Sequence, residues 1–188
     1  MDMRMLKKGI MVIAMLLLAL GTHPALAQDS GDQKKTKKEI RAERLKKSRE
    51  KLAQLAADST LILEANVLRN RYQNSFPVSG NNFILIDGNR VVLQTASPSG
   101  GPGFNGLGGI TLRGRITQYE IDVDDKGPIN ILANVSLGGA GFATLRISIS
   151  ADGNATATYT DNWGGRVTFA GVAGDPGESS VFQGTPIL

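Results

Sequence analysis

The side chains that most often carry out enzyme chemistry are almost absent from this sequence. The chain of 188 residues has no cysteine, and its only histidine, His23, lies in an N-terminal segment typical of a cleaved signal peptide. Without thiol or imidazole, a Ser-His-Asp triad, a Cys-His pair and nearly all zinc, copper, haem and iron–sulfur sites are excluded. We therefore expect a protein that is not an enzyme and that binds no cofactor or metal.

Clustered carboxylates form the first remaining candidate site. Asp122, Asp124 and Asp125 could offer oxygen ligands to a calcium ion. Their spacing departs from the EF-hand pattern, because Lys126 and Ala133 would occupy its fifth and twelfth positions. We interpret the aspartates as turn residues at the end of a strand and expect no metal site there.

Two other combinations could support acid–base or nucleophilic catalysis. Glu64 and Glu120 would serve as a carboxylate pair if the fold brought them together. A Ser-Lys dyad would have to use Lys126, the only lysine after residue 58. Nothing in the spacing unites either set, so we interpret these side chains as solvated.

A glycine-rich segment at 97–109 contains a G-x-G-x-x-G pattern that begins at Gly101. A dinucleotide site needs a helix to begin there, whereas Pro102 interrupts the pattern and a strand pattern follows, so we do not expect nucleotide binding. Two interpretations stay open. The segment is a simple connection at the end of a sheet, which we favour, or a lid or partner-binding loop with Phe104 and Leu107 at its tip.

Aromatic residues in loops and turns are the best candidates for contacts with a ligand or a partner. Tyr72 and Phe76 follow the first expected strand, and Trp163 lies in a turn between Asn162 and two glycines. Trp163 either anchors a partner from an exposed position or folds back over the end of a barrel, and both interpretations stay open. The candidate contact residues are Tyr72, Phe76, Phe104, Leu107 and Trp163.

The elements that must position these residues begin after a secretory signal. Lys7 and Lys8 precede an apolar run at 9–20, which is too short to cross a bilayer as a helix. The Ala-Leu-Ala sequence at 25–27 is a small-x-small cleavage site, so we expect residues 1–27 to be removed after Ala27. We predict a periplasmic or secreted protein with no transmembrane segment after cleavage.

Residues 28–58 form a charged segment with a predicted helix over 33–57, rich in strong helix formers. Apolar residues gather only near its end, at Leu52, Leu55 and Ala56, so we expect the last two turns to dock on a sheet. The basic run either contacts an acidic surface or membrane head groups or, as we favour, forms a solvated spacer. Residues 59–188 carry eight basic and ten acidic side chains, which argues against nucleic-acid binding.

Residues 59–188 show the alternation of an antiparallel β domain. Apolar and polar residues alternate in 129–137 and in 143–150, and a Gly-rich link joins the two runs. The Asp-Gly-Asn sequence at 87–89 marks another hairpin. The expected strands are 61–68, 83–86, 90–95, 110–123, 129–137, 143–150, 155–160 and 166–172.

The parity of the apolar residues changes within the strand at 110–123. Apolar residues stand at even positions up to Ile116 and at odd positions from Tyr119 onward. An extra residue must restore the inward direction, so we predict a β-bulge near residues 117–118. In the first strand, Leu61, Leu63, Ala65 and Val67 keep a single parity, and we expect all four on one face.

Strands joined mostly by short turns predict a mainly β fold. We expect an antiparallel eight-stranded meander that closes into a barrel or strongly coiled sheet of the lipocalin kind, with the charged α-helix in front. The outward face is Thr, Ser, Asn and Arg, so we expect it to meet water rather than lipid. Small residues on the inward face predict either a cavity for an apolar ligand or, as we favour, close packing. Residues 178–188 add an edge strand or lie across one end.

Three segments carry a resemblance to a known family: 82–93, 106–119 and the Ser-Val-Phe-Gln-Gly sequence at 180–184. Together with the signal peptide and the charged helix, they make residues 61–188 similar to the bacterial domain-of-unknown-function family numbered 4251. These motifs are structural glycines and apolar alternation, which imply no chemistry. The resemblance implies a secreted envelope protein and carries over no activity and no catalytic residue.

Two functions from different classes fit these patterns. The leading prediction is a non-enzymatic envelope β module that binds a small apolar ligand in its interior or at its open end. The alternative is a protein-interaction or scaffolding module of the cell envelope, which would use the Gly-rich loop, Trp163 and the basic helix. An internal cavity on the order of a few hundred Å³ would favour the ligand, and a filled interior with exposed aromatic residues would favour the partner.

Overall fold

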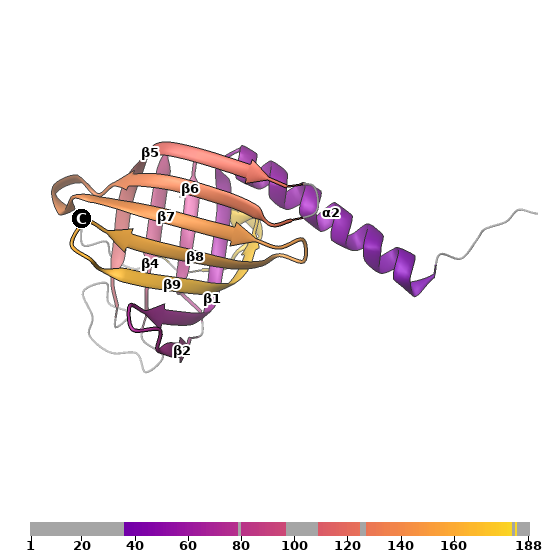
Figure 1. The fold of residues 1–188 in the computed structure, drawn as a ribbon, viewed down its shortest axis with the longest axis horizontal. Helices are drawn as coiled ribbons and strands as arrows, with labels where there is room; N and C mark the ends of the chain where they lie inside the picture. The colour runs from indigo at the N-terminus through magenta and orange to yellow at the C-terminus, as the bar shows by residue number, and fades with distance from the viewer. Residues whose placement is uncertain (1–35, 79, 97–108, 125–126, 182, 184–188) are drawn as a thin grey trace, which may run out of the picture. The chain divides into compact units, whose positions relative to one another are not determined.

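The structure is a computed structural model that describes residues 36–183, except 79, 97–108, 125–126 and 182. In this part of the chain, the helix α2 (Lys37–Ala57) precedes nine strands (Figure 1). The strands are β1 (Thr60–Asn70), β2 (Ser75–Pro77), β3 (Phe83–Asp87), β4 (Arg90–Gln94), β5 (Thr111–Val123), β6 (Ile129–Ser136), β7 (Phe142–Ile149), β8 (Asn154–Asp161) and β9 (Arg166–Gly174). All eight strands expected from the sequence are present, and β2 is an addition.

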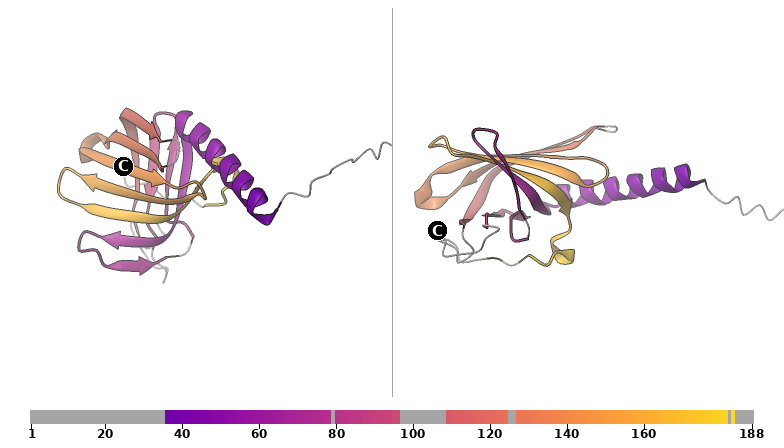
Figure 2. Two further views of the ribbon diagram at one scale, coloured as in Figure 1. Left: turned by 45° about the vertical axis from the view of Figure 1, so that its right-hand side comes forward. Right: turned by 90° about the horizontal axis from the view of Figure 1, so that it is seen from below.

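The sheet closes on itself. Neighbouring strands pair in the order β1-β3-β4-β5-β6-β7-β8-β9, and β9 pairs back with β1. Every pairing is antiparallel, so the predicted meander and its closure are confirmed. The short β2 pairs with the last part of β1, next to the stretch of β1 that pairs with β3. Figure 2 shows β1 and β2 as a hairpin at one side of the barrel.

Two predicted local features, the β3–β4 hairpin turn and the bulge in β5, are present in the structure. Gly88 has φ +60°, a backbone conformation that glycine adopts without strain, and it lies in the tight turn between β3 and β4. In β5, the register shifts between Ile116 and Gln118, so the predicted β-bulge is confirmed. As a result, Ile116 and Tyr119 both pack against the core although their positions differ in parity.

A second bulge, in β1, was not predicted from the sequence. The register with β9 shifts between Ala65 and Val67, and Leu68 rather than Val67 packs against the core. The expectation that Val67 shares the face of Ala65 is therefore wrong, because the bulge turns the chain by one residue. Gly171 permits this bulge, since a Cβ there would lie 1.9 Å from the backbone oxygen of Glu64.

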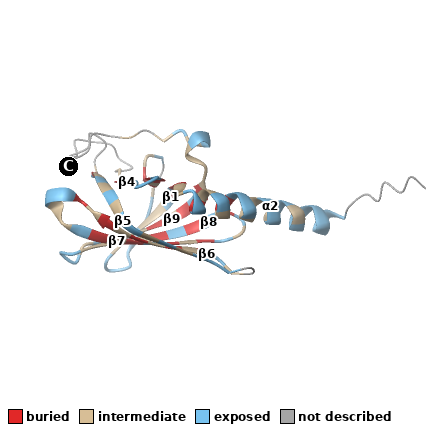
Figure 3. Cartoon of the chain, turned by 90° about the horizontal axis from the view of Figure 1, so that it is seen from above, coloured by how far each residue is buried: buried red, intermediate tan, exposed pale blue. Residues whose placement is uncertain are grey.

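The interior of the barrel is filled by side chains. Inward residues of all eight closing strands form one apolar cluster, and the alanines at 65, 133, 143, 155 and 157 are buried within it. A cavity lined by residues of β4, β5, β6, β7 and β8 has a volume of about 10 Å³, room for about one water molecule. Close packing is thus the outcome for the described interior. Figure 3 shows the buried residues of the strands in red.

The helix α2 begins with a capping box and ends against the barrel. The Thr36 hydroxyl oxygen accepts a hydrogen bond from the Glu39 backbone N–H at 3.3 Å, and the Glu39 carboxylate accepts one from the Thr36 N–H at 2.7 Å. Near the other end, Leu52 and Ala56 are buried, as expected for the last two turns. Within the described residues, no helix is both long enough and apolar enough to cross a membrane.

Polar contacts hold the end of α2 in place. The Tyr119 hydroxyl donates to the backbone oxygen of Ala56 at 2.8 Å. The guanidinium of Arg49 donates to backbone oxygens of Asp124 and Gly127, in the connection between β5 and β6. Lys51 forms an ion pair at 2.8 Å with Glu178. The helix is therefore fixed to both sides of the barrel end by hydrogen bonds as well as by apolar contacts.

The chain after β9 crosses the outside of the barrel. The Ser179 hydroxyl donates to the Glu64 carboxylate on β1 at 2.6 Å, and the Gln183 side chain contacts Arg113 on β5. The described residues after 178 form no strand. On this outer face, Ile62 and Phe83 are buried at 2% and 1% exposure, although neither belongs to the main core.

Candidate functional site

Four exposed aromatic side chains gather at one end of the barrel, and we call them the aromatic rim: Tyr72, Phe76, Phe142 and Trp163. Their exposed fractions are 68%, 50%, 64% and 68%. Side chains of this size are usually buried, because each removes a large apolar area from water. Their joint exposure is therefore the feature of the described surface that most needs a functional explanation.

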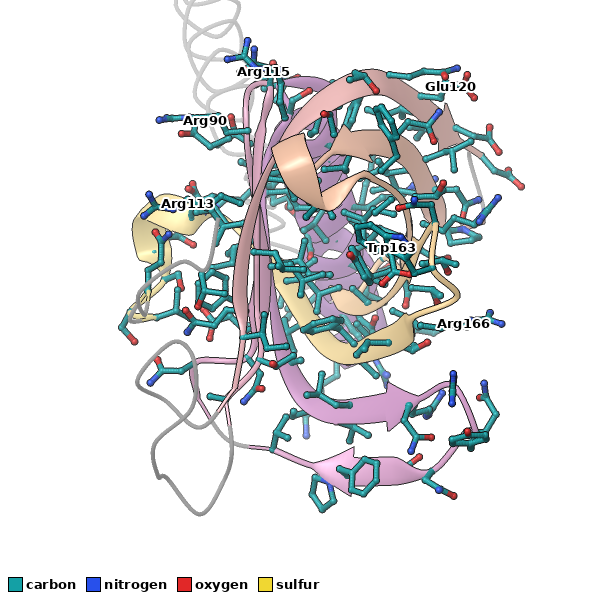
Figure 4. The ribbon with its side chains drawn as sticks, turned by 90° about the vertical axis from the view of Figure 1, so that its left-hand side faces the viewer. Arg90, Arg113, Arg115, Glu120, Trp163 and Arg166 are labelled. Carbon is teal, nitrogen blue, oxygen red and sulfur yellow. The ribbon has the colours of Figure 1, made fainter. Side chains whose placement is uncertain are left out.

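The strand register brings the parts of the rim together. Asn70 at the end of β1 pairs with Val167 near the start of β9, so the β1–β2 turn lies next to the β8–β9 turn. The Asn162 side-chain oxygen accepts a hydrogen bond from the Phe142 backbone N–H at 3.1 Å, which joins the start of β7 to the same turn. Figure 4 shows Trp163 on this turn, exposed at the end of the barrel.

Short side chains fix the backbone beside two of the aromatic residues, Trp163 and Tyr72. Asp161 Oδ1 accepts hydrogen bonds from the backbone N–H groups of Trp163 at 2.9 Å and Gly165 at 2.7 Å. Asn70 Oδ1 accepts hydrogen bonds in the same way from Tyr72 at 2.9 Å and from Asn74 at 3.1 Å. These Asx turns order the backbone of the two turns that carry Trp163 and Tyr72.

Tyr72 carries a cation beside its ring. The Arg71 guanidinium carbon lies 4.8 Å from the ring centroid, and Arg71 Nη2 donates to the Tyr72 hydroxyl at 2.6 Å. The pairing orients a side chain that is otherwise exposed. Arginine and aromatic residues are the types most enriched at the energetic centres of protein interfaces.

A polar hollow of about 430 Å³ borders the rim on the outer face of β6, β7 and β8. Hydrogen bonds tie its side chains together: Thr144 Oγ1 donates to Asn134 Oδ1 at 3.3 Å, and Asn134 Nδ2 donates to Gln118 Oε1 at 2.8 Å. Arg146 lines this hollow and also the neighbouring one of about 510 Å³. The rim thus has a polar border, as protein interfaces commonly do.

The other residues considered in the sequence do not come together. Glu64 lies on β1 and Glu120 on β5, separated in the barrel by β3 and β4, and each accepts a hydrogen bond from its own neighbour, Ser179 or Gln118. Phe104, Leu107, Asp125 and Lys126 lie outside the described residues. Among the described residues, no group of three or more carboxylates or histidines is arranged to hold a metal ion.

Two tyrosines are shielded from water and lie apart from the rim. Burial raises the pKa of Tyr119 to about 12, and burial, followed by the charge of Asp161, raises the pKa of Tyr159 to about 12. Both phenols therefore stay protonated at neutral pH. Tyr119 uses its hydroxyl to hold α2, and Tyr159 belongs to the core, so both side chains have structural roles.

Phe142 is the rim residue that the sequence reasoning missed. A signal was present, since Phe142 has the parity of Thr144 and Arg146, which alternation directs outward. The structure confirms this direction, with Ala143 and Leu145 buried and Phe142 exposed. Only the fold shows that Phe142 stands beside the turn that carries Trp163.

Comparisons with known proteins agree with this architecture. No curated protein matches the chain. Among solved structures, it is similar to a DUF4251 family protein from Bacteroides eggerthii DSM 20697, with 27% sequence identity and a TM-score of 0.58, over 70% of this chain and 90% of that one. The model of that family, a domain of unknown function, matches residues 43–173, which span α2 from its first turns to the end of β9. The chain therefore belongs to the DUF4251 family.

Proposed function

We propose that this protein is an exported, non-enzymatic binding module of the bacterial cell envelope, which contacts a partner protein through the aromatic rim. The observation that carries the proposal is the gathering of four exposed aromatic side chains on neighbouring connections at one end of a closed barrel. Such side chains anchor interfaces because they bury much apolar area with few rotatable bonds.

The fixed backbone of the rim supports this function. Binding costs free energy when loops and side chains must be ordered, and a surface already held by hydrogen bonds avoids part of this cost. The Asx turns at Asp161 and Asn70 provide such order beside Trp163 and Tyr72.

The filled interior of the barrel favours binding of a partner at the rim over binding of a small ligand inside. Pockets for small molecules have volumes of about 300–1,000 Å³. The cavity of about 10 Å³ between the barrel walls is far below this range. An apolar ligand inside would have to push the walls apart, whereas a partner at the rim requires no such change. Export rests on the signal sequence at residues 1–27, which lie outside the described residues.

Site-specific photocrosslinking in the native host tests the proposal. A benzoylphenylalanine residue replaces Trp163 or, separately, Tyr72, and Val123 serves as the control position. Val123 is 44% exposed and lies at the β5–β6 connection, at the opposite end of these strands. We expect one discrete protein adduct from both rim positions, absent from position 123 and lost when Phe142→Ser is added.

Equal crosslinking from Val123, or no adduct from either rim position, would contradict the proposal. The mass of the protein recovered from the host tests export at the same time. We expect the mature chain to begin at Gln28, and a chain that retains residues 1–27 would contradict export.

A further inference from the structure

Three arginines lie together on the outer face of β4 and β5, and we call them the arginine patch: Arg90, Arg113 and Arg115. Arg90 and Arg115 stand directly opposite each other in the strand pair, and Arg113 lies two residues from Arg115 on the same face. All three are exposed. Figure 4 shows them in one column on one side of the sheet.

Arg90 and Arg115 occupy the closest cross-strand arrangement. The Ile116 backbone N–H donates to the Asn89 oxygen at 2.8 Å. The backbone hydrogen bond therefore joins the neighbouring residues 89 and 116, and not Arg90 and Arg115 themselves. The two residues therefore form a non-hydrogen-bonded pair, in which Cα atoms are only about 4.5 Å apart. Like charges directly opposite each other destabilise a sheet. The pair is thus a local cost that folding alone does not explain.

The neighbouring groups compensate only part of this positive charge. Asp87 forms an ion pair with Arg90. Arg113 donates two hydrogen bonds to the side-chain oxygen of Gln183, from Nε at 2.9 Å and from Nη2 at 2.8 Å, when the amide is oriented so that its oxygen faces the guanidinium. The amide is neutral, so it leaves the charge of Arg113 uncompensated. In the part of the chain that the structure describes, the Arg115 side chain has no hydrogen bond or ion pair. About two positive charges are therefore left for a ligand.

A hollow of about 340 Å³ adjoins the patch and is lined by Arg90, Arg113 and Gln183. Asp87 also lines it, with its carboxylate paired to Arg90. The half-buried side chains of Leu85 and Val92 also line it, so the site combines charge with an apolar surface. We propose that the arginine patch binds a phosphate group, carried by a molecule whose apolar part lies on Leu85 and Val92. Arginine suits this role because its planar guanidinium donates two parallel hydrogen bonds to phosphate oxygens.

This site goes beyond the proposed function. It lies on the outer face of β4 and β5, whereas the rim is carried by β2, β7 and the turns around β1, β8 and β9. A doubly charged phosphate would relieve the repulsion between Arg90 and Arg115 and match the uncompensated charge of the patch. The chemistry is shared by a phospholipid head group and a soluble phosphate ester.

Binding measurements on the full mature protein test the proposal with two probes. One probe is inorganic phosphate, followed by calorimetric titration, and the other is a phosphatidylcholine vesicle with or without phosphatidic acid. The test variant is Arg115→Gln, and the matched control is Arg166→Gln, which removes the same charge from an exposed position on the outer face of β9. We expect Arg115→Gln to weaken binding about tenfold or more, and Arg166→Gln to leave it unchanged.

A second variant keeps all three arginines. Gln183→Glu places a carboxylate against Arg113, where it competes with the phosphate, and we expect binding to weaken several-fold while the thermal midpoint does not fall. Binding to phosphatidic acid vesicles alone identifies a lipid head group, and binding to inorganic phosphate identifies a soluble ester; both support the site. Binding to neither probe, or an equal loss in Arg166→Gln, overturns it.

Discussion

The packing of α2 against the barrel end makes a strong prediction for Leu52→Ala. Leu52 is 5% exposed and belongs to the main core, although it comes from a helix whose other positions are mostly exposed. Removing its side chain beyond Cβ loses transfer free energy and leaves a cavity, and such changes cost about 2–5 kcal/mol. The site lies at the end of the barrel and can partly collapse, so we expect about 2–3 kcal/mol. Leucine and alanine both favour helix, so propensity contributes little.

Urea denaturation followed by circular dichroism measures this cost, and Ile40→Ala is the control. Ile40 lies on the same helix but is 39% exposed, so we expect its loss to change stability by less than about 0.5 kcal/mol. In a thermal scan, Leu52→Ala should lower the midpoint by roughly 5–10 °C for a domain of this size. A cost below about 1 kcal/mol, or equal costs for both variants, would refute the docking of α2 on the core.

Three further changes have outcomes set by single contacts. Gly171→Ala places a Cβ 1.9 Å from the Glu64 oxygen, so we expect a loss of about 3 kcal/mol or more in thermal denaturation, against about none for Gly174→Ala, which meets no atom within 4 Å; equal losses would contradict the close approach. The pKa of Tyr119 is raised from 10.0 to about 12, so the stability that its neutral form supplies is complete below pH 10 and is lost as the pH rises toward 12. Tyr119→Phe also loses the hydrogen bond to Ala56, and we expect its urea midpoint to be lower at pH 8 and to fall less steeply at alkaline pH than that of the wild type; parallel curves would contradict this. Asp161→Ala removes two backbone hydrogen bonds from the Trp163 turn, so we expect about 1–2 kcal/mol of destabilisation and lower fluorescence anisotropy of Trp163; an unchanged anisotropy would show that the turn is ordered by other contacts.

The sequence predicted those parts of the fold that depend on neighbours within one strand. Alternation identified the buried face of β6 and β7, because each inward residue is apolar and each turn between strands is short. The bulge in β5 was predictable for the same reason, since the apolar parity changes at Ile116 and Tyr119. The bulge in β1 was not, because the residues around it include both Val67 and Leu68, and alternation cannot tell which of two adjacent apolar residues faces inward.

The two proposed binding surfaces depend on the register between strands, which alternation does not encode. Tyr72, Phe76 and Trp163 were candidates from residue type and turn position alone, and the structure places them at one end of the barrel with Phe142. The opposition of Arg90 and Arg115 depends on how β4 pairs with β5 across the long connection at 97–108. Sequence spacing could not predict that pairing, because a slip of one residue would reverse the faces.

Fluorine NMR of the protein labelled with 5-fluorotryptophan tests the rim most directly. Trp163 is the only tryptophan of the chain, so one resonance reports on it against any background of unlabelled proteins. We expect a resonance with the full solvent isotope shift in the isolated protein, and loss of that shift with broadening when solubilised envelope proteins of the host are added. A resonance that is shielded from water in the isolated protein, or that stays unchanged in the presence of those proteins, would contradict the function proposed for the aromatic rim.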